Sequence, residues 1–190
     1  MSQHHRTHLK AAALLVAAFA LGGWTVARAD TIRFDPSPKT VNVGDTFSLA
    51  LEGAGFASNV DGGGLGFTFN PAVLQITGVT IDTGVWDFFT SFGGYDNTTG
   101  SVADILFSAL QNVSGDFAIA TIQFQAIGGG STALSLSESA LNPFASGGDP
   151  LAVTLANGTV NVIPEPATWL LLLAGLGFAS RFHHNPGRKP

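Results

Sequence analysis

The chain has 190 residues, of which 11% are charged, and it contains 24 glycines and no cysteine. This length suits one domain of ordinary size with additional segments, because a single core typically forms from about 100 to 150 residues. The absence of cysteine from the sequence excludes disulfide bonds, thiolate metal sites and a thiol nucleophile. Low charge combined with abundant glycine favours strands and turns over helices.

Residues 1–29 have the features of a secretory signal peptide. Basic residues precede the apolar run 11–20, and Ala27 and Ala29 supply the small side chains of an A-x-A cleavage site. Cleavage there would make Asp30 the first residue of the mature protein. The alternative is an uncleaved N-terminal anchor, but the apolar run is shorter than the ~20 residues that a membrane span requires.

Residues 30–162 are predicted to form an all-β domain. Large apolar residues alternate with small or polar ones, as in Phe47, Leu49 and Leu51, a pattern typical of half-buried strands. Turns rich in glycine, asparagine and aspartate separate these segments. The predicted strands include 46–51, 64–69, 73–81, 101–110, 117–127, 132–138 and 152–162. Eight or nine strands in all, with no convincing amphipathic helix, predict a two-layer jelly-roll β-sandwich.

Two segments depart from simple alternation. In residues 117–127 the buried face switches near Ala120 and Thr121, which predicts either a β-bulge there or a strand covered on both faces. Residues 83–89 are the only candidate for a helix. Trp86 and its aromatic neighbours are more consistent with a segment that closes an open end of the core.

The domain resembles the cohesin family in a series of short motifs. They occur in the family's order at residues 41–47 (VNVGDTF), 65–74 (LGFTFNPAVL), 120–124 (ATIQF) and 157–162 (NGTVNV). The resemblance covers residues 31–162. It implies a nine-stranded jelly roll that binds dockerin modules of cellulosome proteins and shares its architecture with carbohydrate-binding modules. No dockerin-facing residue of the family can be assigned to a position in this sequence.

The domain is also strongly acidic. From Asp30 to Ile163 there are twelve acidic residues and two basic ones, Arg33 and Lys39, which gives a net charge near −10. This charge excludes nucleic-acid binding through a basic surface. All histidines lie outside this stretch, so acid–base or nucleophilic catalysis would depend on carboxylates and the two basic residues. A binding function, not an enzymatic one, is therefore expected.

Two acidic loop residues are candidates for a calcium site. Asp61 and Asp96 lie in loops rich in glycine and asparagine, which offer the oxygen ligands that Ca²⁺ prefers. Neither loop has the spacing of an EF-hand. The alternative is that these carboxylates only form turns. No other cofactor is predicted.

An aromatic cluster in residues 86–95 has two interpretations. It comprises Trp86, Phe88, Phe89, Phe92 and Tyr95. Exposed rings would stack on sugars and indicate polysaccharide binding. Buried rings would close the core of the sandwich, which is a common role of aromatic residues.

Residues 163–190 combine a stiff tripeptide with an apolar segment. The prolines of Pro164-Glu165-Pro166 remove two backbone donors, so this tripeptide should be extended and exposed. The uncharged residues 167–180 would form about 21 Å of helix, which needs its flanks to cross a hydrocarbon core of about 30 Å. The residues predicted to set the orientation are Trp169 at the interface and Arg181, Arg188 and Lys189 on the cytoplasmic side.

This C-terminal arrangement resembles the PEP-CTERM sorting signal of bacterial exported proteins. The resemblance covers residues 162–190, although Arg181 is separated from the other basic residues by an uncharged insertion. It implies recognition and processing by an exosortase, a membrane-embedded cysteine transpeptidase. The alternative is an ordinary C-terminal membrane anchor.

Together these features predict a non-catalytic protein that is exported across the inner membrane as a membrane-anchored precursor. It would then reside at the cell surface or in the extracellular matrix. Its cohesin-like domain would bind polysaccharide or a surface protein. The alternative function is that of a cohesin-type receptor for a dockerin-bearing protein.

Overall fold

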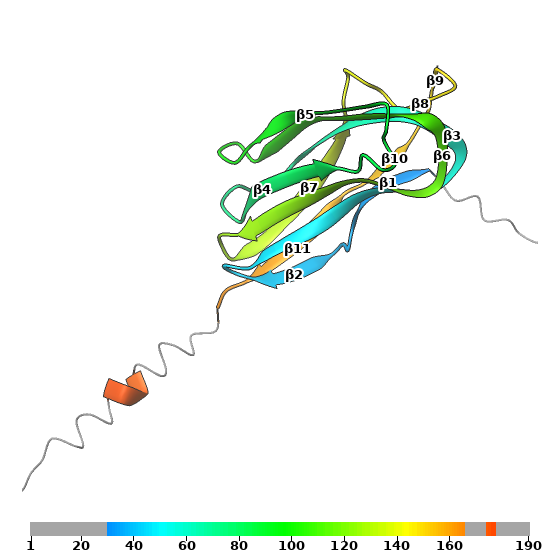
Figure 1. Ribbon diagram of the computed structural model, residues 1–190. Helices are drawn as coiled ribbons and strands as arrows, with labels where there is room; N and C mark the ends of the chain where they lie inside the picture. Colours follow the sequence, from blue (N-terminus) through cyan, green and yellow to red (C-terminus); the bar gives the residue numbers. More distant parts are fainter. Residues whose placement is uncertain (1–29, 166–173, 178–190) are drawn as a thin grey trace, which may run out of the picture.

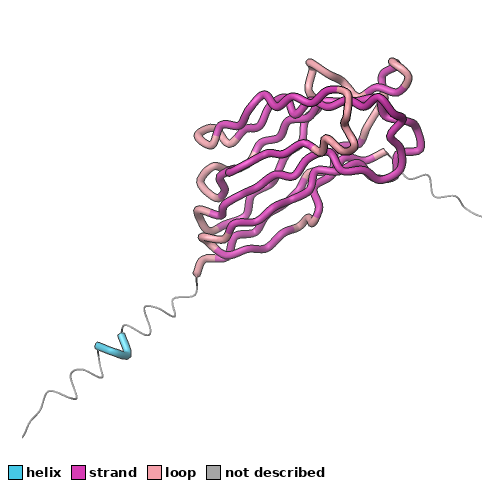
Figure 2. Tube along the Cα trace, in the orientation of Figure 1, coloured by secondary structure: helices cyan, strands magenta, loops and turns pink. Residues whose placement is uncertain are grey.

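The computed structural model describes residues 30–165 and 174–177 (Figures 1 and 2). The folded part consists almost entirely of strands, as the alternating sequence pattern predicts. The strands are β1 (Thr31–Asp35), β2 (Lys39–Asn42), β3 (Thr46–Thr68), β4 (Leu74–Ile81), β5 (Phe89–Asp96), β6 (Ser101–Ala126), β7 (Gly130–Glu138), β8 (Ala145–Ser146), β9 (Asp149–Pro150), β10 (Thr154–Ala156) and β11 (Gly158–Ile163).

The fold is built on one long antiparallel ribbon of β3 and β6. The two strands pair along nearly their whole length, from Thr46 opposite Gln125 to Thr68 opposite Ser101. Four of the five irregularities in their register lie between Leu51 and Gly62, where the ribbon bends over one end of the molecule (Figure 1). Bulges permit this bend because an extra residue increases the local twist and curvature of a strand. Each half of the ribbon thus becomes the centre of one layer.

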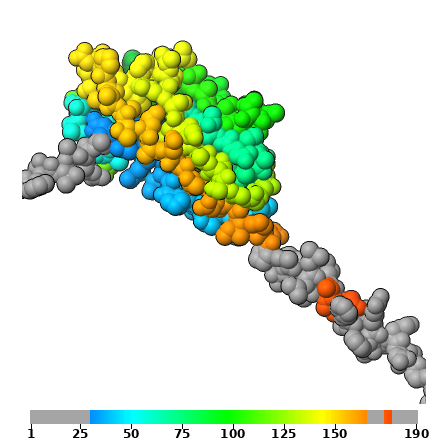
Figure 3. Space-filling model, turned by 180° about the vertical axis from the view of Figure 1, so that it is seen from behind, coloured from blue at the N-terminus to red at the C-terminus, as the bar shows by residue number. Residues whose placement is uncertain are grey.

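The two layers are completed by shorter strands on either side of the ribbon. β5 and residues 135–138 of β7 flank one half, and β4 and β1 flank the other. β11 pairs antiparallel with β7 and parallel with β2. The last strand of the chain therefore lies beside one of the first, as Figure 3 shows from behind. The result is an all-β jelly-roll sandwich, which confirms the predicted fold class.

Alternate residues of the ribbon form the core between the layers. Leu49, Leu51, Leu65 and Phe67 of β3 are each at most 1% exposed. Their partners on β6 are buried in the same way, because residues opposite each other in adjacent strands project to the same side of the sheet. The alternation that predicted half-buried strands therefore does create the core.

Several strand boundaries differ from those expected. The segments 46–51 and 64–69 belong to one strand, and 101–110 and 117–127 belong to another, because both chains remain paired through the bend. Residues 152–162 form two short strands instead of one. β1, β2 and β5 were not expected, since glycine, proline and aromatic clusters obscure their alternation.

The predicted change of face in residues 117–127 is confirmed. Leu51 is opposite Ala120 and Glu52 is opposite Ala118, so Ile119 is the extra residue of a β-bulge. Ile119 and Ala120 are both buried.

Residues 83–89 contain a turn and no helix. The backbone N–H of Trp86 donates to the carbonyl of Asp82, and Trp86 is 1% exposed. Closure of the core by Trp86 is therefore confirmed. Phe88 and Phe89 do not share this role, because they are 66% and 50% exposed.

The predicted signals fall mostly outside the described residues. This holds for the signal peptide with Ala27 and Ala29, and for the C-terminal residues Pro166, Trp169, Arg181, Arg188 and Lys189. Residues 174–177 are helical, and within the parts of the chain that the structure describes no helix is long and apolar enough to cross a membrane. Pro164 and Glu165 are exposed and follow β11, which ends at the opposite end of the sandwich from the start of β1 (Figure 1).

Candidate functional site

The outer side of one layer carries almost exclusively small side chains. This side is defined by register, because Leu65, Phe67 and Ile105 point into the core and their neighbours must point outward. We call it the small-residue face, and its small members are Gly62, Gly64, Gly66, Thr68, Ser91, Gly94, Ser101, Ala103, Ser108, Ser135 and Ser137. The larger outward residues are Phe89 and Leu106, toward the end of the sheet where the ribbon bends, and the acidic residues Asp96 and Asp104. The surface is thus flat, with an apolar region at one end.

A segment that follows β7 packs over part of this face. Asn142 donates from Nδ2 to the carbonyl oxygens of Gly63 and Phe107, at 2.8 and 3.2 Å. A Cβ on Gly64 would lie 2.7 Å from Leu106 Cδ2 and 2.9 Å from Ser139 Cβ. Glycine at position 64 therefore permits this close approach, and the rest of the face is left open.

A β-bulge creates a pocket in the open part of the face. Leu65 is opposite Ile105 and Phe67 is opposite Val102, so Gly66 faces two residues, Ala103 and Asp104. Asp104 has a φ of 56°, in the left-handed region that aspartate tolerates better than most residues. The pocket has a volume of about 210 Å³ and is lined by Gly66, Val102, Ala103, Asp104, Ser137, Glu138, Ser139 and Ala140.

Glycine also keeps the floor of this pocket open. A Cβ on Gly66 would lie 2.7 Å from the carbonyl oxygen of Val102 and 3.3 Å from Ser137 Oγ. On one wall, Ser139 Oγ donates to Asp104 Oδ1 at 2.7 Å. Ser139 is buried, so this hydrogen bond holds the Asp104 carboxylate in position at the edge of the pocket.

The outer side of the other layer has longer polar side chains. Gln75, Gln123 and Gln125 project from β4 and β6. On the neighbouring strands, Arg33 pairs with Glu52 at 2.6 Å. The hydrogen bond to Glu52, with the attraction between the two charges, raises the pKa of Arg33 above its ordinary value. This layer therefore lacks the flatness of the small-residue face.

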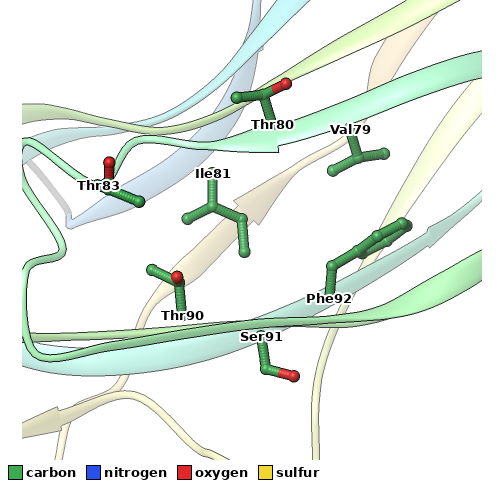
Figure 4. A pocket seen from close by; sticks show the side chains of 7 residues that line it. All are labelled: Val79, Thr80, Ile81, Thr83, Thr90, Ser91 and Phe92. Atoms are coloured by element: carbon green, nitrogen blue, oxygen red, sulfur yellow. The ribbon is translucent and has the colours of Figure 1, made fainter.

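A crevice separates the edge strands β4 and β5 (Figure 4). Val79 and Ile81 of β4 face Thr90 and Phe92 of β5 across it, and its volume is about 300 Å³. Thr80 and Ser91 point away from this gap in Figure 4. The crevice is the side opening of the sandwich, where the two layers are not joined by a strand.

The two predicted calcium ligands lie far apart and each stabilises a turn. Asp61 accepts a hydrogen bond from the Gly148 N–H, and Asp96 accepts from the N–H groups of Thr98 and Thr99. These bonds, that from Thr98 first, lower the pKa of Asp96 below its usual value. Within residues 30–165 and 174–177 no three His, Cys, Asp or Glu side chains are grouped to hold a metal ion.

A specific calcium site and simple screening of the domain's charge predict different effects on its melting temperature. If screening alone acts, millimolar Ca²⁺ and Na⁺ at matched ionic strength raise the melting temperature equally, because both relieve the repulsion of about ten excess negative charges. Differential scanning calorimetry of the two salt series measures this. A larger shift with Ca²⁺, lost in Asp61→Asn or Asp96→Asn, would establish a specific site.

The aromatic cluster divides between the two interpretations. Trp86 is buried and Phe92 is half-buried against the core, whereas Phe88, Phe89 and Tyr95 are exposed. Phe92 and Tyr95 stack with ring centroids 6.1 Å apart. Only phenylalanine and tyrosine are therefore accessible in this cluster, and of these Phe89 lies on the small-residue face.

Sequence reasoning did not identify the small-residue face or the pocket beside Gly66. A signal was present, since Gly62, Gly64 and Gly66 recur with period two beside Leu65 and Phe67. The spacing of Val102, Ile105 and Phe107 also breaks alternation at Asp104. Neither pattern shows by itself which strands lie side by side.

The fold places the chain among cohesin-like jelly rolls. No protein-family model matches the sequence, and no curated protein matches it either. The similarity is found among solved structures and extends over most of the described domain. It confirms the cohesin-like fold expected from the motifs.

Three solved structures illustrate the similarity. A non-cellulosomal cohesin from the archaeon Archaeoglobus fulgidus is 15% identical, with 76% of this chain and 98% of that chain covered and a TM-score of 0.60. The third cohesin of ScaC from Acetivibrio cellulolyticus, in complex with a dockerin, is 19% identical, with 70% and 98% covered and a TM-score of 0.56. A type I cohesin–dockerin complex from Clostridium thermocellum gives 11% identity, 72% and 100% coverage and a TM-score of 0.60. At such identities the likeness establishes the fold alone.

Proposed function

We propose that this chain is a non-catalytic binding module that docks a protein partner on the small-residue face. The observation that carries this proposal is the flat surface of glycine, alanine, serine and threonine, which lets a partner's backbone approach the sheet closely. Shape complementarity of this kind is what a specific interface requires. Two of the three cohesin structures described above are complexes with dockerins, which makes a dockerin-bearing protein the first candidate partner.

The apolar end of the face supplies an anchor for such a partner. Phe89 of β5 is 50% exposed and lies opposite Ser108 of β6. Leu106 lies on β6, two residues before Ser108. Aromatic side chains that become buried at the centre of an interface commonly contribute much of its affinity. A protein partner could cover both residues and the adjacent small-residue surface together.

Binding measurements with two classes of probe test this function. The full chain, immobilised, is exposed to purified dockerin modules and, separately, to a glycan array. We expect saturable binding to a dockerin or to another protein drawn from the secretome of the same cells. Binding to glycans without any protein partner would overturn the proposal and favour a polysaccharide-binding function through Phe88, Phe89 and Tyr95.

We further propose that the protein is exported and sorted by an exosortase-type transpeptidase. Ile163 is the last residue of β11 to pair, and Glu165 is exposed just beyond it. A Cβ on Gly129 would lie 2.9 Å from Pro164 Cγ, so the tripeptide begins directly at the surface of the domain. After processing, the domain would remain at the cell surface or in the extracellular matrix.

Replacing Pro164-Glu165-Pro166 by three alanines should block loss of the C-terminal tail while leaving the domain folded. The two prolines keep this stretch out of the sheet, and Glu165 offers the only charge for recognition. Mass spectrometry of the mature protein measures the C-terminus. The matched control is alanine substitution of the exposed Asp149-Pro150 pair, which should leave processing unchanged. A wild-type chain that still ends at Pro190 in exosortase-bearing cells would reduce the motif to an ordinary anchor.

A further inference from the structure

The pocket beside Gly66 combines negative charge with small hydroxyl groups. Its carboxylate comes from Asp104, and its hydroxyls come from Ser137 and Ser139. Glu138 also lines the pocket, but it pairs with the core-facing Leu65, so its side chain projects to the other side of the sheet. At about 210 Å³ the pocket is far larger than the about 10–15 Å³ that one water molecule needs. It therefore has room for the end of a side chain from another molecule.

The Asp104 carboxylate uses one oxygen to stabilise the pocket itself. Asp104 Oδ1 accepts from Ser139 Oγ at 2.7 Å. Asp104 Oδ2 receives no hydrogen bond from the described residues. This second oxygen thus remains free to accept.

The negative charge of the pocket is also not neutralised from within the described domain. Among residues 30–165 and 174–177 the only ion pair joins Arg33 to Glu52, on the other layer. The remaining basic residue of the domain, Lys39, lies on β2, which pairs with β11. A positively charged ligand would therefore neutralise the charge of this pocket.

We propose that this pocket receives a cationic side chain, arginine or lysine, of the protein that docks on the small-residue face. This inference rests on the proposed function and specifies the chemistry of the partner. A guanidinium or ammonium group can donate to Asp104 Oδ2 and to the Ser137 hydroxyl, and hydrogen bonds between charged groups are the strong ones. The net charge near −10 of residues 30–163 attracts such a partner over a longer range.

A metal ion suits the pocket less well than a cationic side chain. Calcium takes six to eight oxygen ligands, typically with several carboxylates. The pocket offers one carboxylate, Asp104, which already uses one oxygen for a hydrogen bond within the domain. An organic cation needs only a few acceptors, which Asp104 Oδ2 and the Ser137 hydroxyl provide.

The test measures binding of small probes that mimic one partner side chain. N-acetyl-arginine amide and N-acetyl-lysine amide are titrated into the ¹⁵N-labelled full chain, with the neutral N-acetyl-citrulline amide as the isosteric control. We expect saturable shifts of the Gly66, Ser137 and Ser139 amide resonances with the cationic probes and none with citrulline. Equal shifts with citrulline, or no shifts at all, would overturn the inference.

Two charge-neutralising variants complete the test. Asp104→Asn keeps a residue that tolerates the left-handed backbone and can still accept from Ser139, so the fold should persist. Asp104→Asn should lower the affinity of the cationic probes at least tenfold. Asp149→Asn, which removes an equal charge on β9, should change their affinity less than twofold. An equal loss of probe affinity in both variants would mean that only the net charge of the domain matters, and it would overturn the proposal that this pocket binds a cation.

The probes and the protein partner report separately on the two proposals. If a protein partner binds the small-residue face but the probes cause no shifts of the amide resonances, the inference fails and the proposed function stands. If the probes bind as expected but no protein occupies the face, the pocket is a cation site and the proposed function fails.

Discussion

Replacing Trp86 by alanine is expected to lower the free energy of unfolding by about 3–5 kcal/mol, the typical cost of removing a large aromatic side chain from a core. Trp86 lies at 4.4 Å from Phe107 and 5.4 Å from Phe117, measured between ring centroids. These two residues belong to the two halves of β6, so the indole fills the interior where the ribbon bends. Its Nε1–H also donates to the Ala118 carbonyl at 2.9 Å, and this acceptor would lose its partner.

Urea denaturation followed by far-UV circular dichroism measures this loss. Phe88→Ala is the matched control, because Phe88 precedes β5 in the same segment but is 66% exposed. We expect it to change stability by at most about 0.5 kcal/mol, as is usual for surface substitutions. Similar effects of the two variants would show that Trp86 does not close the core.

Ser137→Arg is expected to weaken binding of the protein partner by about 100-fold or more without unfolding the domain. Ser137 is exposed and lies opposite Gly66, in the open part of the small-residue face. A long side chain there would hold a partner's backbone away from the sheet and forfeit the close packing that the interface needs. The same substitution leaves the core untouched, because the side chain points to solvent.

Surface plasmon resonance with the captured partner gives the dissociation constants of the wild-type protein and of the Ser137→Arg variant. Ser48→Arg is the matched control, since Ser48 is exposed on β3 but projects from the outer side of the other layer. It adds the same charge and bulk, so it should leave the affinity within about twofold. If Ser137→Arg binds as well as Ser48→Arg does, the partner uses another surface.

Most of the fold class could be predicted because alternation is a local property. Phe47, Leu49 and Leu51 identify a buried face wherever the strand is placed, and the bulge at Ile119 was visible as a break in that pattern. Strand continuity was harder to predict. The glycines and polar residues between positions 52 and 64 read as a loop, yet they remain paired with β6 through the bend.

The candidate site could be predicted much less well. Asp61 and Asp96 were chosen for their composition, and both turned out to stabilise turns. In the sequence, Asp104 is one of several acidic residues with no local feature that distinguishes it from the others. Its role depends on Gly66 and Ser139, which lie about 40 and 35 positions away and meet it only in the folded sheet.

The sequence by itself determined that residues 30–163 form an acidic all-β domain without histidine or cysteine. These properties follow from composition and from the period of the side chains along a strand, which need no knowledge of distant partners. Only the tertiary structure decided that β3 and β6 form one folded ribbon, and which outward residues share a layer. It also decided that Asp104 and Glu138 border one pocket. Such pairings depend on register between strands far apart in the chain, and register is set by the packing of the whole core.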